Sequence, residues 1–259
     1  MTFLIRSLTS LAYVALLLGS LILNNHLFSV VIFSLMIASL WELQQISAQK
    51  LPWVFAVAFL VYLFVIWQQR FTTVALGLAL FGNAVLVYFF WVKKTVILNK
   101  DVVAFLSLFQ ISIPLLLVAL LGNDNPEWML LFFCIVWVND TGAYIIGSWI
   151  GKTPLAKKIS PNKTLEGFFG GVLIATSFTL VLGLTFNLGI WSELLLIAIV
   201  TAAFGGLGDL IQSKVKRICS VKDSGKLLPG HGGIYDRVDS TLLAVPIYIL
   251  LLQLTNYVS

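Results

Sequence analysis

The chain has 259 residues, with 16 Lys and Arg against 11 Asp and Glu and a formal net charge of +5. Only 10% of its residues are charged and 59% are hydrophobic, whereas a soluble domain typically carries about 25% charged residues. So few charges could not cover the surface of a soluble globule, which excludes an ordinary cytosolic enzyme. The 19 Phe and 8 Trp exclude a disordered chain. The composition therefore predicts a polytopic membrane protein.

Apolar runs long enough to cross a bilayer recur along the whole chain. The hydrocarbon core of a bilayer is about 30 Å thick and needs about 20 apolar residues of helix. We expect about nine transmembrane helices on this criterion, and hence an all-α polytopic integral membrane protein. The runs are residues 7–23, 27–46, 51–67, 71–92, 102–122, 128–150, 167–189, 191–212 and 240–258.

The basic residues divide unequally between the two sides that these spans define. Cytoplasmic loops of membrane proteins are enriched in Lys and Arg. If the N-terminus is cytoplasmic, every Lys and Arg except Arg70 lies on the cytoplasmic side. The distribution therefore predicts a cytoplasmic N-terminus and a C-terminus on the opposite side of the membrane.

Polar residues are concentrated in the second half of the chain. Residues 1–122 are nearly featureless apolar spans, about five by the same length criterion, with Glu42 and Asp101 as their acids. Residues 123–259 carry polar groups inside the spans, together with two long cytoplasmic loops, 151–166 and 213–239. We therefore expect the catalytic region in residues 123–259.

Asn139 and Asp140 lie near the middle of the sixth run. An ionisable group at that depth costs about 3 kcal/mol or more on insertion scales and usually marks a ligand or ion site. The alternative is an interhelical hydrogen bond of Asn139 beside a neutral Asp140, worth about 0.6 kcal/mol on average. We favour a functional Asp140, because Thr141, Gly142 and Ala143 permit close approach of a backbone or ligand.

The loop 151–166 carries four lysines and the start signals of the next helix. Thr164 to Glu166 opens the seventh run, so Lys163 lies at a helix N-terminus, where it could bind a phosphate beside free backbone N–H groups. Alternatively, the lysines hold the loop in the cytoplasm and contact anionic headgroups. The loop alone leaves both interpretations open.

The eighth run ends in a polar face. If the helix continues, Asp209, Ser213 and Lys216 share one face at i, i+4 and i+7. A carboxylate, a hydroxyl and an ammonium in line at a membrane surface suit a metal-bound phosphate. The alternative is a packing seam, made by the glycines of 205–208 and ending in cations.

The segment 222–239 alternates glycines, acids and bases. Asp236 and Asp239 would project from one face of the last run, and Mg²⁺ in such sites usually takes one or two carboxylates plus substrate phosphates. Lys226 and Arg237 could neutralise phosphate oxygens, Arg with bidentate geometry. Local ion pairs, such as Asp236 with Arg237, are the alternative explanation.

His231 lies between glycines in this segment. It could donate to a phosphate, carry a proton or bind a ligand, and it could equally serve only to shape the loop. His26 lies across the membrane on the predicted topology, so a His-based zinc site is not expected.

The stretch from Ser213 to Asp239 resembles the signature of the phosphatidate cytidylyltransferase (CDP-diacylglycerol synthase) family, without a departure. The matching groups include Lys-Asp at 222–223, Leu-Pro at 228–229, His-Gly-Gly-Ile at 231–234 and Asp-Arg-Val-Asp at 236–239. The motifs at 139–144 and 160–167 also resemble that family. Residues 1–122 resemble it only in being hydrophobic.

The resemblance implies an enzyme that joins CTP to phosphatidate, releases pyrophosphate and leaves CDP-diacylglycerol in the membrane. It also implies an all-helical membrane fold with a cytoplasmic-side polar cavity, a homodimer, Mg²⁺, and a potassium ion associated with the site. Asp209 and Asp236 match the metal-linked acids of the family. The expected catalytic residues are Asp209, Asp236, Lys216 and Arg237, and the expected substrate-binding residues are Lys163, Glu166, Ser213, Arg217, Lys222, Asp223, Lys226, His231, Asp239 and Asp140.

The chemistry of such a transfer predicts direct displacement. The second pKa of a phosphate monoester is about 6, so the attacking phosphate needs no strong base, and the sequence offers no nucleophile–base pair. A cation-coupled transporter is a rival interpretation, disfavoured because no internal repeat is visible. A CTP-dependent enzyme acting on a polyprenol or an isoprenoid ether lipid stays open. We expect a bacterial inner-membrane location, because no targeting extension is visible, and no nucleic-acid partner.

Overall fold

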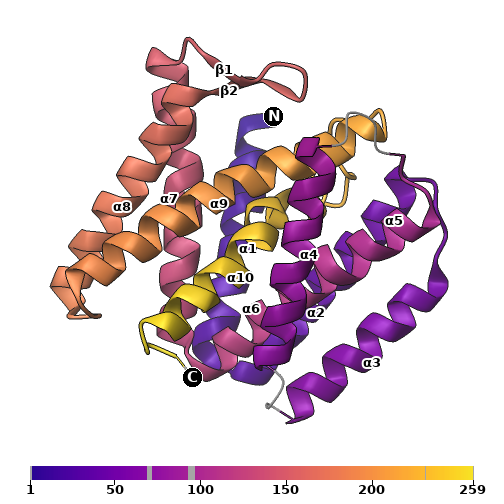
Figure 1. Ribbon diagram of the computed structural model, residues 1–259, viewed down its shortest axis with the longest axis horizontal. Coiled ribbons are helices and arrows are strands. Elements are labelled where there is room, and N and C mark those ends of the chain that lie inside the picture. The colour runs from indigo at the N-terminus through magenta and orange to yellow at the C-terminus, as the bar shows by residue number, and fades with distance from the viewer. Residues whose placement is uncertain (1, 69–71, 93–96, 231, 259) are drawn as a thin grey trace. The chain divides into compact units, whose positions relative to one another are not determined.

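The computed structural model describes residues 2–68, 72–92, 97–230 and 232–258, and helices make up most of it (Figure 1). Its elements in chain order are α1 (Thr2–Leu23), α2 (Asn25–Ile46), α3 (Pro52–Gln68), α4 (Thr72–Val92), α5 (Lys100–Phe105), η1 (Leu106–Ser112), α6 (Ile113–Asp124), α7 (Pro126–Ile150), β1 (Pro154–Ala156), β2 (Ser160–Thr164), α8 (Leu165–Phe186), α9 (Trp191–Ile218) and α10 (Tyr235–Leu254).

The predicted fold class, an all-α polytopic membrane protein, is confirmed. Within the described residues, seven helical segments are long and apolar enough to cross a bilayer. Two further apolar helices are shorter, Leu8–Leu23 and Pro52–Gln68. The second of these has 17 residues and so measures about 25 Å, against about 30 Å of hydrocarbon. The count of nine spans and the orientation of the termini stay predictions.

The chain divides into two compact units, and each combines segments from distant parts of the sequence. The first unit consists of Met1–Pro126 and Val215–Asp239, and the second consists of Glu127–Lys214 and Ser240–Ser259. Residues 215–239, which carry most of the signature, therefore fold with the N-terminal helices.

In the first unit, sequence features explain where α2 begins and why the span formed by α5, η1 and α6 is interrupted. Asn24 caps α2, because its side chain accepts from the backbone N–H groups of His26 and Leu27. Pro114 follows the π-helical turn η1, and its ring nitrogen has no hydrogen to donate to the preceding turn. This interruption explains why α5 and α6 are joined through a wider turn in a single apolar span.

In the second unit, glycines bring α7 and α8 close together. A side chain on Gly142 would lie 3.3 Å from the Cα of Gly171, and one on Gly167 would lie 2.7 Å from the carbonyl oxygen of Ala143. Such contacts suit small residues at helix interfaces within membranes. The packing thus fixes the start of α8 beside the end of α7.

The loop 151–166 contains a short hairpin, which was not expected from the sequence. Strands β1 and β2 pair antiparallel, with Pro154 opposite Thr164 and Ala156 opposite Ser160. The predicted helix start is confirmed, because the Thr164 side chain accepts from the Gly167 N–H and α8 begins at Leu165.

Candidate functional site

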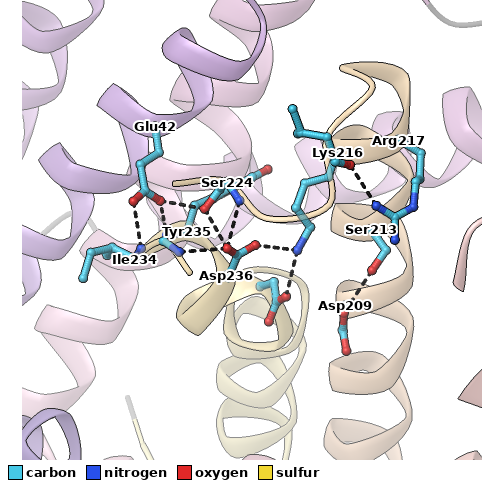
Figure 2. Close-up of polar contacts among 12 residues, drawn as sticks. Glu42, Asp209, Ser213, Lys216, Arg217, Ser224, Ile234, Tyr235 and Asp236 are labelled. Carbon is cyan, nitrogen blue, oxygen red and sulfur yellow. Dashed lines mark hydrogen bonds and ion pairs between the residues drawn. The ribbon is translucent and has the colours of Figure 1, made fainter. Parts of the chain in front are cut away.

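Asp236, in the first turn of α10, is held by four hydrogen bonds from described residues (Figure 2). Its Oδ1 accepts from the ammonium of Lys216 at 2.7 Å. Its Oδ2 accepts from the Ser224 N–H at 2.9 Å, the Ser224 hydroxyl at 3.0 Å and the Gly233 N–H at 2.9 Å. The orientation of this carboxylate is therefore fixed by the segment that precedes it.

Lys216 links the two acids of α10. Its Nζ lies 2.7 Å from Asp236 Oδ1 and 3.6 Å from Asp239 Oδ2. The side chains of Lys216 and Asp236 are each 8% exposed, so their charges are largely removed from water and depend on one another. Asp236 thus has an ion-pair partner from a different helix, in addition to the local pairing suggested by the sequence.

Glu42, on α2, also contacts the signature segment. Its carboxylate accepts from the Ser224 hydroxyl at 2.7 Å and from the backbone N–H groups of Ile234 and Tyr235 at 3.0 and 2.9 Å. Figure 2 shows Glu42 and Asp236 on either side of Ser224. Glu42 was not among the expected site residues, although an acid inside an apolar run usually marks a functional site.

The connection between α9 and α10 makes a tight turn at its tip. The backbone N–H of Leu228 donates to the Gly232 carbonyl at 3.0 Å. Gly230 and Gly232 have φ of 78° and 83°, in the region that favours glycine. His231 lies outside the described residues.

The remaining predicted residues of the connection and its flanks are exposed. They are Arg217, Lys222, Asp223, Lys226 and Arg237. The guanidinium of Arg217 donates to the Val221 carbonyl at 2.8 Å and so holds the end of α9 against the following turn.

In the second unit, Asp209 of α9 lies between a lysine and a serine. Its Oδ2 forms an ion pair with Lys163 from β2, and both side chains are 29% exposed. Its Oδ1 accepts from the Ser213 hydroxyl at 3.3 Å, one helical turn further on. Since α9 continues to Ile218, the predicted common face of Asp209, Ser213 and Lys216 is confirmed.

Two other predicted residues have neighbours of their own in this unit. Asp140 Oδ2 accepts from the Ser240 hydroxyl at 3.2 Å. Glu166 accepts from the backbone N–H groups of Lys152 and Thr153 at 3.1 Å and from the Thr153 hydroxyl at 2.8 Å. Glu166 thus closes the base of the hairpin.

Asp209 is the predicted acid whose surroundings suit a divalent cation. Among the described residues, no group of three or more His, Cys, Asp or Glu could hold a metal ion. Mg²⁺, however, usually keeps several waters and takes one or two carboxylates plus substrate phosphates. Asp209 is a partly exposed carboxylate, so waters and substrate phosphates can reach it, and Lys163 beside it could bind a phosphate oxygen. Both acids accept from protein donors at both oxygens. Those of Asp209 are the side chains of Lys163 and Ser213, whereas Asp236 also accepts from two backbone N–H groups and is only 8% exposed, so Asp209 is the more accessible of the two.

Cys219 directly follows the end of α9. Burial raises the pKa of its thiol above the ordinary value, which disfavours the thiolate, the reactive species of a cysteine.

The sequence matches a known protein family and is similar to several curated proteins. The sequence model of the cytidylyltransferase family matches residues 4–255. A phosphatidate cytidylyltransferase of Staphylococcus haemolyticus is 49% identical over 135 residues, which are 51% of this chain and 52% of the relative. Proteins of the same name from Staphylococcus epidermidis and Staphylococcus aureus are 51% and 45% identical over 134 residues, covering 51% of each chain. In these matches the chain spans about half the length of the curated relatives.

Proposed function

The chain belongs to the cytidylyltransferase family, and from that premise we propose that it transfers the cytidylyl group of CTP to phosphatidate. The products are CDP-diacylglycerol and pyrophosphate. The observation that carries the proposal is the buried Lys216–Asp236 pair, held by a glycine-rich segment beside a membrane helix. The names of the staphylococcal relatives support phosphatidate as the lipid substrate.

In the proposed reaction, a phosphate oxygen of phosphatidate attacks the α-phosphorus of CTP. One P–O bond forms, and the bond to the β-phosphate breaks as pyrophosphate leaves. Both reactants are anions, so catalysis requires positive charge around the transferring phosphorus. Lys216 and Arg237 are proposed to supply that charge, with Lys163 and Lys226 binding phosphate oxygens.

We propose that the site uses Mg²⁺, with K⁺ also associated. Asp209 would hold the metal together with substrate phosphates, and a bound Mg²⁺ would neutralise charge that develops on the phosphate oxygens. Ser213, one turn along the same face of α9, would orient the Asp209 carboxylate by its hydrogen bond. Asp236 is proposed to orient Lys216, because their side chains meet at 2.7 Å.

Transfer is proposed to proceed by direct displacement, without a covalent enzyme intermediate. A phosphate monoester is mostly doubly ionised near pH 7, since its second pKa is about 6. Burial raises the pKa of the Cys219 thiol and so disfavours the thiolate that an attack would need. Trapping a cytidylyl-enzyme or phosphoryl-enzyme during turnover would overturn this part of the proposal.

The proposed active site faces the cytoplasm, where CTP is present, in the inner membrane of a bacterium. This orientation places every Lys and Arg except Arg70 on the cytoplasmic side, as the positive-inside rule requires. The protein is proposed to act as a homodimer.

The lipid specificity can be tested with purified protein in mixed micelles. With Mg²⁺ and CTP labelled at the α-phosphate, label is expected to enter the lipid phase when phosphatidate is present. Polyprenol, polyprenyl phosphate and isoprenoid ether lipid phosphates serve as comparison acceptors. Preferential labelling of one of these, with phosphatidate unlabelled, would exclude the phosphatidate proposal.

A further inference from the structure

Glu42 is a fully buried carboxylate on a membrane helix of the N-terminal half. Its side chain is 0% exposed, and it lies in the last turns of α2 between Trp41 and Leu43. Burying a charge is costly unless it is paired and hydrogen-bonded. Within the described part of the chain, the hydrogen-bond donors to Glu42 come from residues 224–235, about 190 positions further along the chain.

Two of these donors belong to the start of α10. The backbone N–H groups of Ile234 and Tyr235 are at the helix N-terminus, where they have no partner within the helix. A carboxylate there also interacts favourably with the helix dipole. Glu42 therefore caps the same helical turn that presents Asp236.

Ser224 connects the two carboxylates. Its hydroxyl lies 2.7 Å from Glu42 Oε2 and 3.0 Å from Asp236 Oδ2, while its backbone N–H donates to Asp236. A serine hydroxyl has one hydrogen to donate, so the two carboxylates share it, and the Ser224 backbone N–H is a separate donor to Asp236. Movement of Glu42 would therefore remove a contact that positions residue 224, whose backbone N–H holds Asp236.

Two glycines of the signature, Gly225 and Gly233, lie so close to Glu42 that a side chain at either position would overlap its carboxylate. A side chain on Gly225 would overlap Glu42 Oε1, and one on Gly233 would overlap both Glu42 Oε2 and the Ser224 hydroxyl. The absence of side chains at these positions is thus explained by the carboxylate against which they pack.

We propose that Glu42 is a positioning residue for the reaction, holding residues 224–235 so that Asp236 orients Lys216. This inference rests on the proposed cytidylyl transfer. It gives the N-terminal half a role at the site, through a residue outside the signature.

The first test compares Glu42→Gln and Glu42→Asp in the full-length protein. The three described groups that hydrogen-bond to Glu42 are donors, and a backbone N–H points at each oxygen, so an amide NH₂ in place of either oxygen faces a donor. Misplacement of a catalytic group by about 1 Å can reduce turnover about 100-fold. Glu42→Gln is expected to lower kcat by about that factor with little change in the KM for CTP, and Glu42→Asp is expected to recover part of it.

Gln44→Leu is the matched control. Gln44 is a buried polar residue on the same helix, and it makes two hydrogen bonds to the backbone of Leu51, outside the signature. The control variant loses a comparable number of buried contacts but should keep kcat near the wild-type value. An equal fall of kcat in both variants would show a general effect of destabilising α2 and overturn the proposal.

Hydrogen exchange supplies a readout that does not depend on activity. In Glu42→Gln, the amides of Ile234 and Tyr235 should exchange faster, together with the Ser224 and Gly233 amides that donate to Asp236. In Gln44→Leu these four amides should keep their protection. Unchanged exchange at Ser224 and Gly233 in Glu42→Gln would overturn the proposed link to Asp236. If the wild type makes no CDP-diacylglycerol, the proposed function fails while this exchange result still decides whether Glu42 holds Asp236.

Discussion

The ammonium of Lys216 lies 2.7 Å from the carboxylate of Asp236, and each side chain is only 8% exposed. Lys216 comes from the last turn of α9 and Asp236 from the first turn of α10. The pair therefore joins the two ends of the glycine-rich connection, and a second acid, Asp239, lies 3.6 Å from the same ammonium.

Lys216→Met is expected to destabilise the protein more than Asp236→Asn does. The first change leaves two carboxylates without their ammonium, and removing one partner of a buried pair costs about 3–5 kcal/mol. The second leaves Lys216 beside Asp239 and keeps an acceptor at position 236. Denaturation midpoints in mixed micelles measure the difference.

Lys222→Met serves as the stability control for this pair. Lys222 is an exposed lysine of the same connection, so its removal should change the free energy of unfolding by no more than about 0.5 kcal/mol. A larger loss of stability in Asp236→Asn than in Lys216→Met would contradict the arrangement described here.

Lys163→Met is expected to reduce activity with little loss of stability. Its ion pair with Asp209 is partly exposed, so it contributes at most about 1 kcal/mol. Loss of a charged phosphate contact costs about 1.5–3 kcal/mol, equivalent to about 10-fold to 100-fold in kcat/KM for CTP. Lys157→Met, on the same hairpin, is the matched control, and an equal loss in both variants would exclude a specific role for Lys163.

Glu166→Gln is expected to loosen the hairpin. The carboxylate of Glu166 accepts from Lys152 and Thr153 at the base of β1, and an amide cannot accept at both oxygen positions. Trypsin should therefore cleave faster after Lys157 or Lys158, which are exposed in the turn.

Trypsin digestion of the wild-type protein in membrane vesicles tests the proposed topology. Cleavage at the hairpin is expected in inverted vesicles and not in right-side-out vesicles. Asp101→Asn is the control for Glu166→Gln, because Asp101 is an exposed acid in the first turn of α5. In that variant trypsin should cleave the hairpin at the wild-type rate. Hairpin cleavage only from the outside would reverse the proposed orientation.

Asp140→Asn is expected to lower turnover more than it lowers the amount of folded protein. The asparagine can still accept from the Ser240 hydroxyl, so the local packing should persist while the carboxyl group is lost. Ser240→Ala removes the hydrogen bond but keeps the carboxyl group, and it should retain more activity. A wild-type rate in Asp140→Asn would remove Asp140 from the site.

Local spacing predicted several contacts of the site correctly. The i, i+4 relation of Asp209 and Ser213 follows from helical periodicity, and the two side chains meet at 3.3 Å. The cap at Thr164 was also predictable, because the residues that make it are neighbours in sequence. These contacts need no knowledge of how distant helices pack.

The contacts of Glu42 could not be predicted in this way. They join α2 to residues 224–235 across about 190 positions, and no periodic pattern specifies which apolar helix lies against a distant loop. The pairing of Lys216 with Asp236 likewise depends on how the glycine-rich connection brings α10 back to α9. The hairpin was missed because its strands have only three and five residues and each contains a proline.

The most direct test of the central claim follows two labels in one reaction. Purified protein receives phosphatidate, Mg²⁺ and CTP labelled differently at the α- and γ-phosphates, with Asp236→Asn alongside. The proposed transfer predicts α-label in the lipid, γ-label in pyrophosphate, equal amounts of the two, and a loss of both in the variant and with EDTA. The appearance of γ-label in the lipid, or of inorganic phosphate without labelled lipid, from folded protein would contradict cytidylyl transfer.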